Sequence, residues 1–302
     1  MFSRVQAMRG IDWTIPKRYL RLTLYDGRVV TTNKRVLSNL DDYFKITGDI
    51  SATVSGAAAE ANFTLYGLKL DKMAFLSTSF STWVVNQIRN EIVLDIGYEN
   101  NHGIMFNGTI TEALPSLDNE NYSVKLKCMG SFAETLNSVV SLSFSGITPV
   151  SVIVARIAAK LGYLPRVSSS VKLMTVANYS LQNQPITNHL RYLAEIAGID
   201  CFVENDMVVA KKSGEAMALA RTYKIDSSNM IGSPIPTNEG ARVRVRLDPS
   251  IRTGQKVRLV SVKFPQLSGE VFIVQTIGTS FDTRGNDWKN ELWLVKEGLY
   301  RQ

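Results

Sequence analysis

The fold is decided by the segment Lys17–Thr31, which reads KRYLRLTLYDGRVVT. Leu20, Leu22 and Leu24 alternate in it with more polar residues, and this period of two places apolar side chains on one face of a half-buried strand. The pair Asp26-Gly27 follows, and such a pair favours the tight turn of a hairpin. We therefore predict that the chain turns back here and forms a second strand.

The same alternation extends through the first part of the chain. It predicts further strands at Phe44–Val54, Ala61–Tyr66, Ile92–Tyr98, Gly103–Ala113 and Asn121–Met129. A short helix near Asp71–Leu76, with Asp71 able to cap it, interrupts this series. Six or seven strands suit a barrel, so residues 1–140 are expected to form a β-barrel domain.

The period changes from two to that of a helix near Thr148. Thr148-Pro149 is typical of a capped helix start, and the apolar spacing continues to Gly162, which is expected to end the helix. A second amphipathic helix is expected from Ile186 to Gly198, followed by a hairpin of Ile199–Glu204 and Met207–Lys211. Residues 141–215 are therefore predicted to form a small mixed α/β domain.

Alternation resumes in the last part of the chain, residues 216–302. Strands are expected at Arg242–Leu247, Lys256–Val262, Val271–Thr279 and Lys289–Lys296. The chain is thus predicted to be mainly β with a small α/β part, because two β-rich segments bracket one α/β insert.

The composition is that of an ordinary folded protein. The chain has 302 residues, of which 45% are apolar and 20% are charged. Cys128 and Cys201 are too few for a disulfide framework or a structural zinc site. No apolar stretch reaches the roughly 18 residues of a membrane span, so we expect no membrane span and synthesis inside a cell. Of the net charge of +7, most lies in residues 216–302, which hold 13 basic and 8 acidic groups.

The residues offer little support for catalysis. The glycine-rich loops that bind phosphates are absent from the sequence. His102 and His189 are too few for a multi-histidine metal site. Cys201 and His189 could form a nucleophile and its base, but a cysteine in an apolar strand is more often packed as a small hydrophobe. We expect no enzymatic activity, no cofactor and no metal site.

Paired carboxylates could still support glycoside hydrolysis, since their separation cannot be read from a sequence. The candidates are Asp95, Glu99, Glu112 and Glu120. Their position beside polar turns favours the interpretation of solvated strand ends.

The most distinctive charge pattern is the run Arg242 to Leu247, RVRVRL. On a strand it would point Arg242, Arg244 and Arg246 to one face, about 6.7 Å apart, and three apolar side chains to the other. Such a row could be a solvated face, a protein interface or a nucleic-acid contact, in that order of preference. Trp293 lies five residues after Trp288, so the two point to opposite faces, and one of them could be interfacial.

Three segments of the chain resemble phage baseplate hub proteins. The first is Gln182–Val203, a polar entry followed by a leucine- and alanine-rich helix, a glycine and a short strand. The second is Met230–Pro234 followed by Arg242–Leu259, and the third is Phe281–Trp288. The resemblance is to the hub proteins of contractile-tailed bacteriophages, and the related spike bases of type VI secretion look similar.

The resemblance implies an architecture and a role. Each chain would contribute two tube-like antiparallel β-barrels, residues 1–140 and 216–302, on either side of the α/β insert at 141–215. A homotrimer would then adapt the hexameric tail tube to the three-fold spike and frame a channel for the tape measure and DNA. The protein would be a structural component of the virion baseplate, assembled in the host cytoplasm, and would contact the tube protein, the spike and other baseplate proteins.

Two other functions stay open at this point. One is a tail-associated peptidoglycan hydrolase, and the other is a nucleic-acid-binding barrel that uses Arg242, Arg244 and Arg246. Arg242, Arg244, Arg246 and Trp293 are the candidate interface or channel residues under the hub interpretation.

Overall fold

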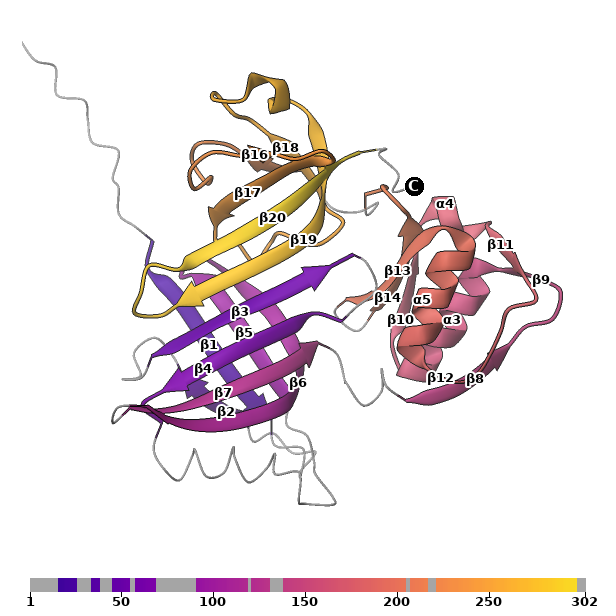
Figure 1. The fold of residues 1–302 in the computed structure, drawn as a ribbon, viewed down its shortest axis with the longest axis horizontal. Helices are drawn as coiled ribbons and strands as arrows, with labels where there is room; N and C mark the ends of the chain where they lie inside the picture. The colour runs from indigo at the N-terminus through magenta and orange to yellow at the C-terminus, as the bar shows by residue number, and fades with distance from the viewer. Residues whose placement is uncertain are drawn as a thin grey trace, which may run out of the picture.

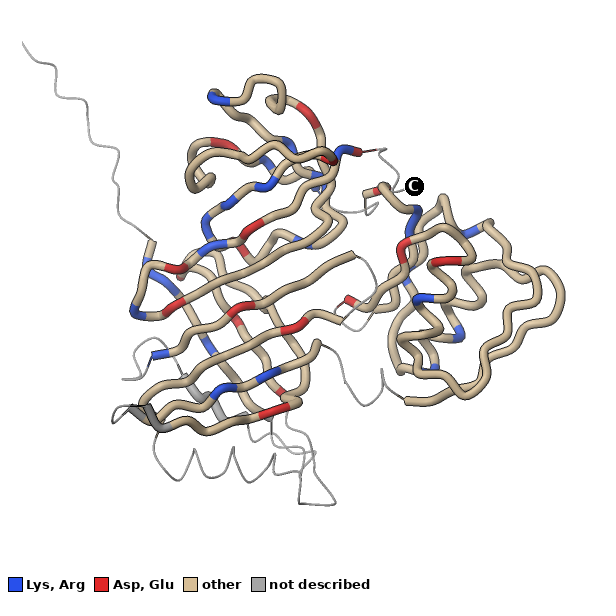
Figure 2. The backbone as a smooth tube through the Cα atoms, in the orientation of Figure 1, with Lys and Arg blue, Asp and Glu red and all other residues tan. Residues whose placement is uncertain are grey.

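The computed structural model describes residues 16–25, 34–38, 45–54, 58–68, 91–118, 121–130, 138–204, 207–216 and 221–297. This part of the chain is mainly β, with a small α/β part, as the alternation predicts. Figure 1 shows one long curled sheet on the left and a smaller unit of helices and short strands on the right. In the same view, Figure 2 shows charged residues spread over the long sheet.

Seven strands from the first part of the chain belong to the long sheet: β1 (Arg18–Tyr25), β2 (Lys34–Ser38), β3 (Ile46–Thr53), β4 (Glu60–Tyr66), β5 (Glu91–Tyr98), β6 (Asn101–Asp118) and β7 (Asn121–Gly130). The predicted strands between Phe44 and Met129 are confirmed, with shifted ends. β1 pairs antiparallel with β2 and with β5. The predicted turn at Asp26-Gly27, its return strand and the helix at Asp71–Leu76 lie outside the described residues.

The middle of the chain forms what we call the α/β unit. Its elements are β8 (Val139–Ser143), β9 (Ile147–Pro149), α3 (Val150–Leu161), β10 (Leu164–Val167), α4 (Ser169–Lys172), β11 (Thr175–Ala177), β12 (Ser180–Pro185), α5 (Ile186–Ala197), β13 (Ile199–Glu204) and β14 (Met207–Lys212). β13 and β14 form the predicted hairpin, β10 joins them in parallel, and two short ribbons, β8–β12 and β9–β11, lie beside them.

Glycines end both long helices as the sequence predicts. Gly162 and Gly198 have left-handed backbones, with φ of 71° and 62°, which a residue without Cβ adopts at little cost. The start of α3 differs from the prediction. Pro149 is its N-cap residue and no side chain caps the helix, while Thr148 is paired with Val176 in the β9–β11 ribbon.

The last part of the chain adds β15 (Tyr223–Ile225), β16 (Ile235–Pro236), β17 (Gly240–Arg246), β18 (Lys256–Leu259), a 3-10 turn (Pro265–Leu267), β19 (Val271–Asp282) and β20 (Trp288–Lys296). The four strands predicted here are confirmed. β19 connects the two parts of the sheet, because its first residues pair with β18 and its residues Thr276–Asp282 pair with Thr47–Thr53 of β3. The strand order is therefore β16-β17-β20-β19-β3-β4-β7-β6-β5-β1-β2.

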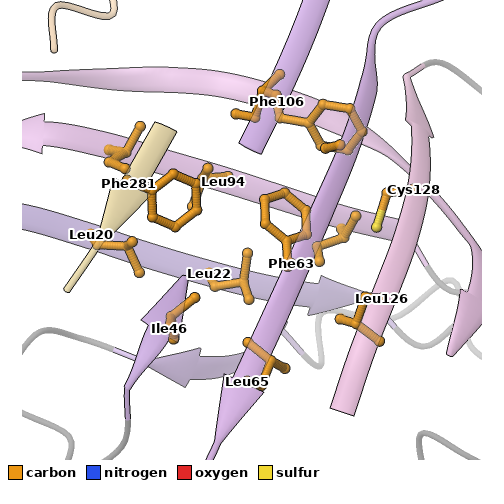
Figure 3. Close-up of a cluster of buried hydrophobic side chains, with 14 of the residues drawn as sticks. Leu20, Leu22, Ile46, Phe63, Leu65, Leu94, Phe106, Leu126, Cys128 and Phe281 are labelled. Carbon is orange, nitrogen blue, oxygen red and sulfur yellow. The ribbon is translucent and has the colours of Figure 1, made fainter. Parts of the chain in front are cut away.

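The long sheet curls around two separate cores. One is formed mainly by the first seven strands, with Leu247, Phe281 and Trp288 from the last part of the chain. Figure 3 shows Phe63, Phe106 and Phe281 in this core among leucines and Ile46. The other lies behind β17, β19 and β20 and contains Val243, Leu292 and Leu294. Burial of this apolar surface is the main favourable term that holds each part together.

A third core fills the α/β unit between α3, α5 and the β13–β14 hairpin. The unit contacts the long sheet through a much smaller apolar cluster, in which Val54 at the end of β3 packs against Phe202, Val209 and Met207. None of the described helices is long and apolar enough to cross a membrane.

Candidate functional site

β17 presents the arginine row as an alternating strand. Val243 and Val245 point into the core behind the strand and are almost fully buried, while Arg244 and Arg246 are exposed on the opposite face. Arg242 is half-buried on that same outer face. The structure thus places all three arginines on one side of the sheet.

The row does not carry three free positive charges. Glu291 lies opposite Arg244 on β20, and its carboxylate accepts a bond from Nη2 of Arg242 at 2.8 Å and from Nε of Arg244 at 2.9 Å. The hydrogen bond from Arg242, with that from Arg244, holds the pKa of Glu291 below its ordinary value. The same bond raises the pKa of Arg242. One carboxylate therefore offsets part of the charge of two arginines.

Trp293 lies next to this ion pair. It stands opposite Arg242 on β20, and Cζ of Arg242 lies 4.7 Å from the centre of its ring, which is a cation–π contact. The ring also covers Gly278 of β19, where an added Cβ would lie 3.3 Å from Cζ3. Trp288 is buried in the first core, so the two tryptophans point to opposite faces as predicted.

Arg246 ends the row at the junction between the two parts of the sheet. It stands opposite Lys289, so two basic residues are neighbours here. Asp248 follows and accepts hydrogen bonds from Oη of Tyr223 at 2.7 Å and from Nδ2 of Asn101 at 3.3 Å. Burial alone would raise the pKa of Asp248, but the bonds from Ser250 and Tyr223 hold it below its ordinary value.

The outer face of the row continues onto the first part of the sheet. Oγ1 of Thr276 donates to Oγ1 of Thr53 at 3.2 Å across the β19–β3 pair. Lys45 forms an ion pair at 2.9 Å with Asp282, which lies on the same side of β19 as Thr276. The candidate residues therefore lie on one polar face shared by both parts of the chain.

The cysteine and histidine considered for catalysis are both buried. Burial raises the pKa of Cys201 to about 12, so its thiol stays protonated at neutral pH. Nδ1 of His189 lies 2.9 Å from Oη of Tyr179, and its Nε2 lies 3.2 Å from the carbonyl of Val140. These partners tie α5 to the β8–β12 ribbon, which is a packing role. Burial also raises the pKa of Cys128.

The three described carboxylates considered for hydrolysis contact a lysine or a histidine and not one another. Asp95 contacts Nδ1 of His102 at 3.0 Å, Glu99 contacts Nζ of Lys17 at 3.1 Å, and Glu112 pairs with Lys127. Glu120 lies outside the described residues. Within the described ranges, no three metal-ligating side chains come together.

Sequence reasoning missed one cavity, which opens where the first part of the sheet, the α/β unit and the loop before β18 meet. Ile50, Phe106 and Ile277 contribute apolar lining, and Glu204 and Thr253 contribute polar groups. Oγ1 of Thr253 donates to Oε1 of Glu204 at 3.2 Å. Burial raises the pKa of Glu204, partly offset by this bond and by Arg252. The lining residues come from segments far apart in the sequence, so no local motif could indicate the cavity.

Comparisons with solved structures show the fold. A tail protein from Neisseria meningitidis MC58 is 12% identical, with a TM-score of 0.63 over 94% of this chain and 98% of that chain. The 43 kDa tail protein of prophage MuSo2 from Shewanella oneidensis is 11% identical, with a TM-score of 0.61 over 92% and 97%. The c3393 protein of E. coli, a component of the type VI secretion system, is 8% identical, with a TM-score of 0.51 over 84% and 73%.

Sequence comparison identifies the family. None of the curated proteins matches the chain. A family model described as baseplate hub gp41 matches residues 27–290, which is most of the sequence and includes the arginine row and the whole α/β unit, while Trp293 lies three residues beyond the match. The resemblance noted in the sequence is confirmed, and the chain belongs to the baseplate hub gp41 family of phage tail structural proteins.

Proposed function

We propose that this protein is the structural hub of a contractile phage tail baseplate. Three copies form a ring that adapts the hexameric tail tube to the three-fold spike and frames the channel for the tape measure and DNA. The ring contacts the tube protein, the central spike and other baseplate proteins. It is assembled in the host cytoplasm and stays in the virion.

The observation that carries this proposal is the presence of two separate β cores in one chain, joined by the β19–β3 pair. If residues 1–140 and 216–302 each act as a tube-like barrel, three chains present six such barrels, which matches a hexameric tube on one side and a trimeric spike on the other. Residues 141–215 then form an appendage between them.

In this proposal the protein has no enzymatic activity, and the arginine row faces a neighbouring chain or the channel. The Arg242–Glu291–Arg244 contacts support that assignment. A row partly neutralised in this way holds the backbone of DNA weakly, so DNA can pass without sequence-specific binding.

Light scattering coupled to size exclusion tests the proposal directly. We expect a mass three times the 33.6 kDa of one chain, and a ring in electron micrographs of the same fraction. A protein that stays monomeric at high concentration would contradict the hub. Loss of turbidity of a cell-wall suspension would favour the hydrolase instead, and strong salt-sensitive retention on DNA would favour the nucleic-acid-binding alternative.

A further inference from the structure

The α/β unit has its own core, and a small joint attaches it to the long sheet. Within the described ranges, none of its strands pairs with a strand of the long sheet. Figure 1 shows the β13–β14 hairpin beside the end of β3, where Val54 packs against Phe202, Val209 and Met207. Ala58, in the segment before β4, touches the core of the unit. These contacts form the apolar part of the joint.

The polar part of the joint is centred on Glu204, the last residue of β13. Its Oε1 accepts a hydrogen bond at 3.2 Å from Oγ1 of Thr253 in the loop before β18. The charged groups that act on it are Arg252 of the same loop and Arg166 of β10 in the unit itself. Met207, which stands opposite Glu204 on β14, is uncharged. Among the described residues that line the cavity, Glu204 and Arg252 are the ionisable ones.

The joint is incompletely packed. A cavity of about 80 Å³ lies in it, with Phe202 of the unit on one side and Ile50 and Ile277 of the long sheet on the other. Side chains that line a cavity lack the dispersion contacts that a close-packed interface provides. A small interface of this kind, between two parts with separate cores, is where relative motion is expected while each part stays folded.

The β13–β14 hairpin separates the joint from the core of the unit. Phe202 and Val209, which are cross-strand partners, belong to the apolar cluster of the joint together with Val54. The neighbours of Phe202 along β13, Cys201 and Val203, belong to the core of the unit on the opposite face. A swing of the whole unit would therefore uncover Phe202 and Val209 and leave Cys201 buried.

We propose that the α/β unit opens from the long sheet at this joint as a rigid body, and that ionisation of Glu204 favours the open state. The joint lies within one chain, so the inference does not depend on the proposed trimer. Burial is the largest influence on Glu204 and raises its pKa, and the opposing effects of Thr253, Arg252 and Arg166 are smaller. The closed joint therefore holds the proton of Glu204 more tightly than the open joint, where water reaches the carboxylate.

The equilibrium between the two states follows from this difference. The closed state is the major one, because opening exposes the apolar side chains of Phe202 and Val209. A rise in pH shifts the equilibrium toward the open state, since the open state gives up the proton first. Over the pH range in which only the open state is ionised, the ratio of open to closed molecules rises up to about tenfold for each unit of pH. It becomes constant once Glu204 is ionised in both states.

Thiol labelling with site-specific mass spectrometry detects an open state of low population. Val209→Cys places a thiol on the joint face of the hairpin. Dividing its labelling rate by that of an exposed thiol, introduced as Leu173→Cys, corrects for the thiolate fraction at each pH, because Leu173 is 86% exposed. The corrected rate is proportional to the open fraction. Cys201 is the internal control, since it is labelled only when the core of the unit unfolds.

Rigid-body opening predicts that the thiol introduced at position 209 reacts at least about tenfold faster than Cys201. Val54→Cys repeats the measurement from the sheet side of the joint should Val209→Cys lower the melting temperature. Equal rates at the introduced thiol and at Cys201 would overturn the proposal, because the joint would then open only when the unit unfolds. The mass of the assembly tests the hub separately, so the two can fail independently.

The pH dependence of the corrected rate tests the role of Glu204. The rate should rise with pH and then level off. Glu204→Gln should keep the slow rate that the unsubstituted glutamate shows at low pH, with no dependence on pH. Glu195→Gln is the matched control, because Glu195 is an exposed glutamate of α5, and it should leave the profile unchanged. A corrected rate that ignores pH, or that falls as the pH rises, would overturn the assignment to Glu204.

Discussion

Breaking the Asp200–Lys211 pair by removing one partner should cost far more stability than breaking an ion pair on the surface. The two residues stand opposite each other on β13 and β14, with Nζ of Lys211 2.6 Å from Oδ2 of Asp200. The Lys211 side chain is only 3% exposed and that of Asp200 18%. Asp200→Asn keeps the shape but leaves an uncompensated buried ammonium, which costs about 3–5 kcal/mol. Local opening of the hairpin should become more than about a hundredfold more frequent.

Hydrogen exchange of the β13 and β14 amides measures that opening, and urea unfolding measures the whole chain. Glu99→Gln is the control, because the Lys17–Glu99 pair is 68% and 53% exposed and should contribute no more than about 1 kcal/mol. A double variant, Asp200→Leu with Lys211→Met, should recover most of the loss, since it removes both charges. If Asp200→Asn costs no more than Glu99→Gln, the argument from burial is wrong.

Three further outcomes follow from the described geometry. Burial raises the pKa of Glu204, so the stability that its protonated form contributes is fully present below the ordinary pKa of a glutamate and is lost as the pH rises through the raised value. Glu204→Gln should therefore raise the melting temperature at pH 7 and flatten the dependence of the melting temperature on pH. A variant with the same pH profile as the wild type would contradict this prediction. Cys128 and Cys201 are buried with raised pKa values, so a thiol reagent should modify neither in the native protein and both in denaturant; fast labelling in the native state would count against their packing. Glu291→Gln removes the partner of Arg242 and Arg244, so it should strengthen low-salt retention on DNA, with Glu297→Gln on the same strand's end as control; equal retention would refute the shielding.

Local patterns predicted the elements of this fold well. The alternation of Leu20, Leu22 and Leu24 gives a strand because only that period puts all three in one core, where they are buried. The glycines at 162 and 198 end their helices because their left-handed backbone disfavours other residues. Each of these signals is contained within a few consecutive residues.

Pairings between distant segments could not be predicted in the same way. Thr276 pairs with Thr53, more than two hundred residues earlier, and the alternation of a strand does not identify its neighbour. The same limit applied to the arginine row. Strand alternation predicts that the Glu291 side chain points outward, because its neighbours Asn290 and Leu292 are buried. Its position between Arg242 and Arg244 depends on the register of β17 with β20, which the alternation does not give.

The junction at β19 also has a mechanical consequence. Seven residue pairs join Thr276–Asp282 to Thr47–Thr53, and the same strand also pairs with β20 and β18. A pull that drags one half of the chain along the strand direction must shear these backbone bonds together, whereas a contact made by side chains alone would peel apart one group at a time. Tension applied to one part of the sheet is therefore carried to the other part through these backbone hydrogen bonds.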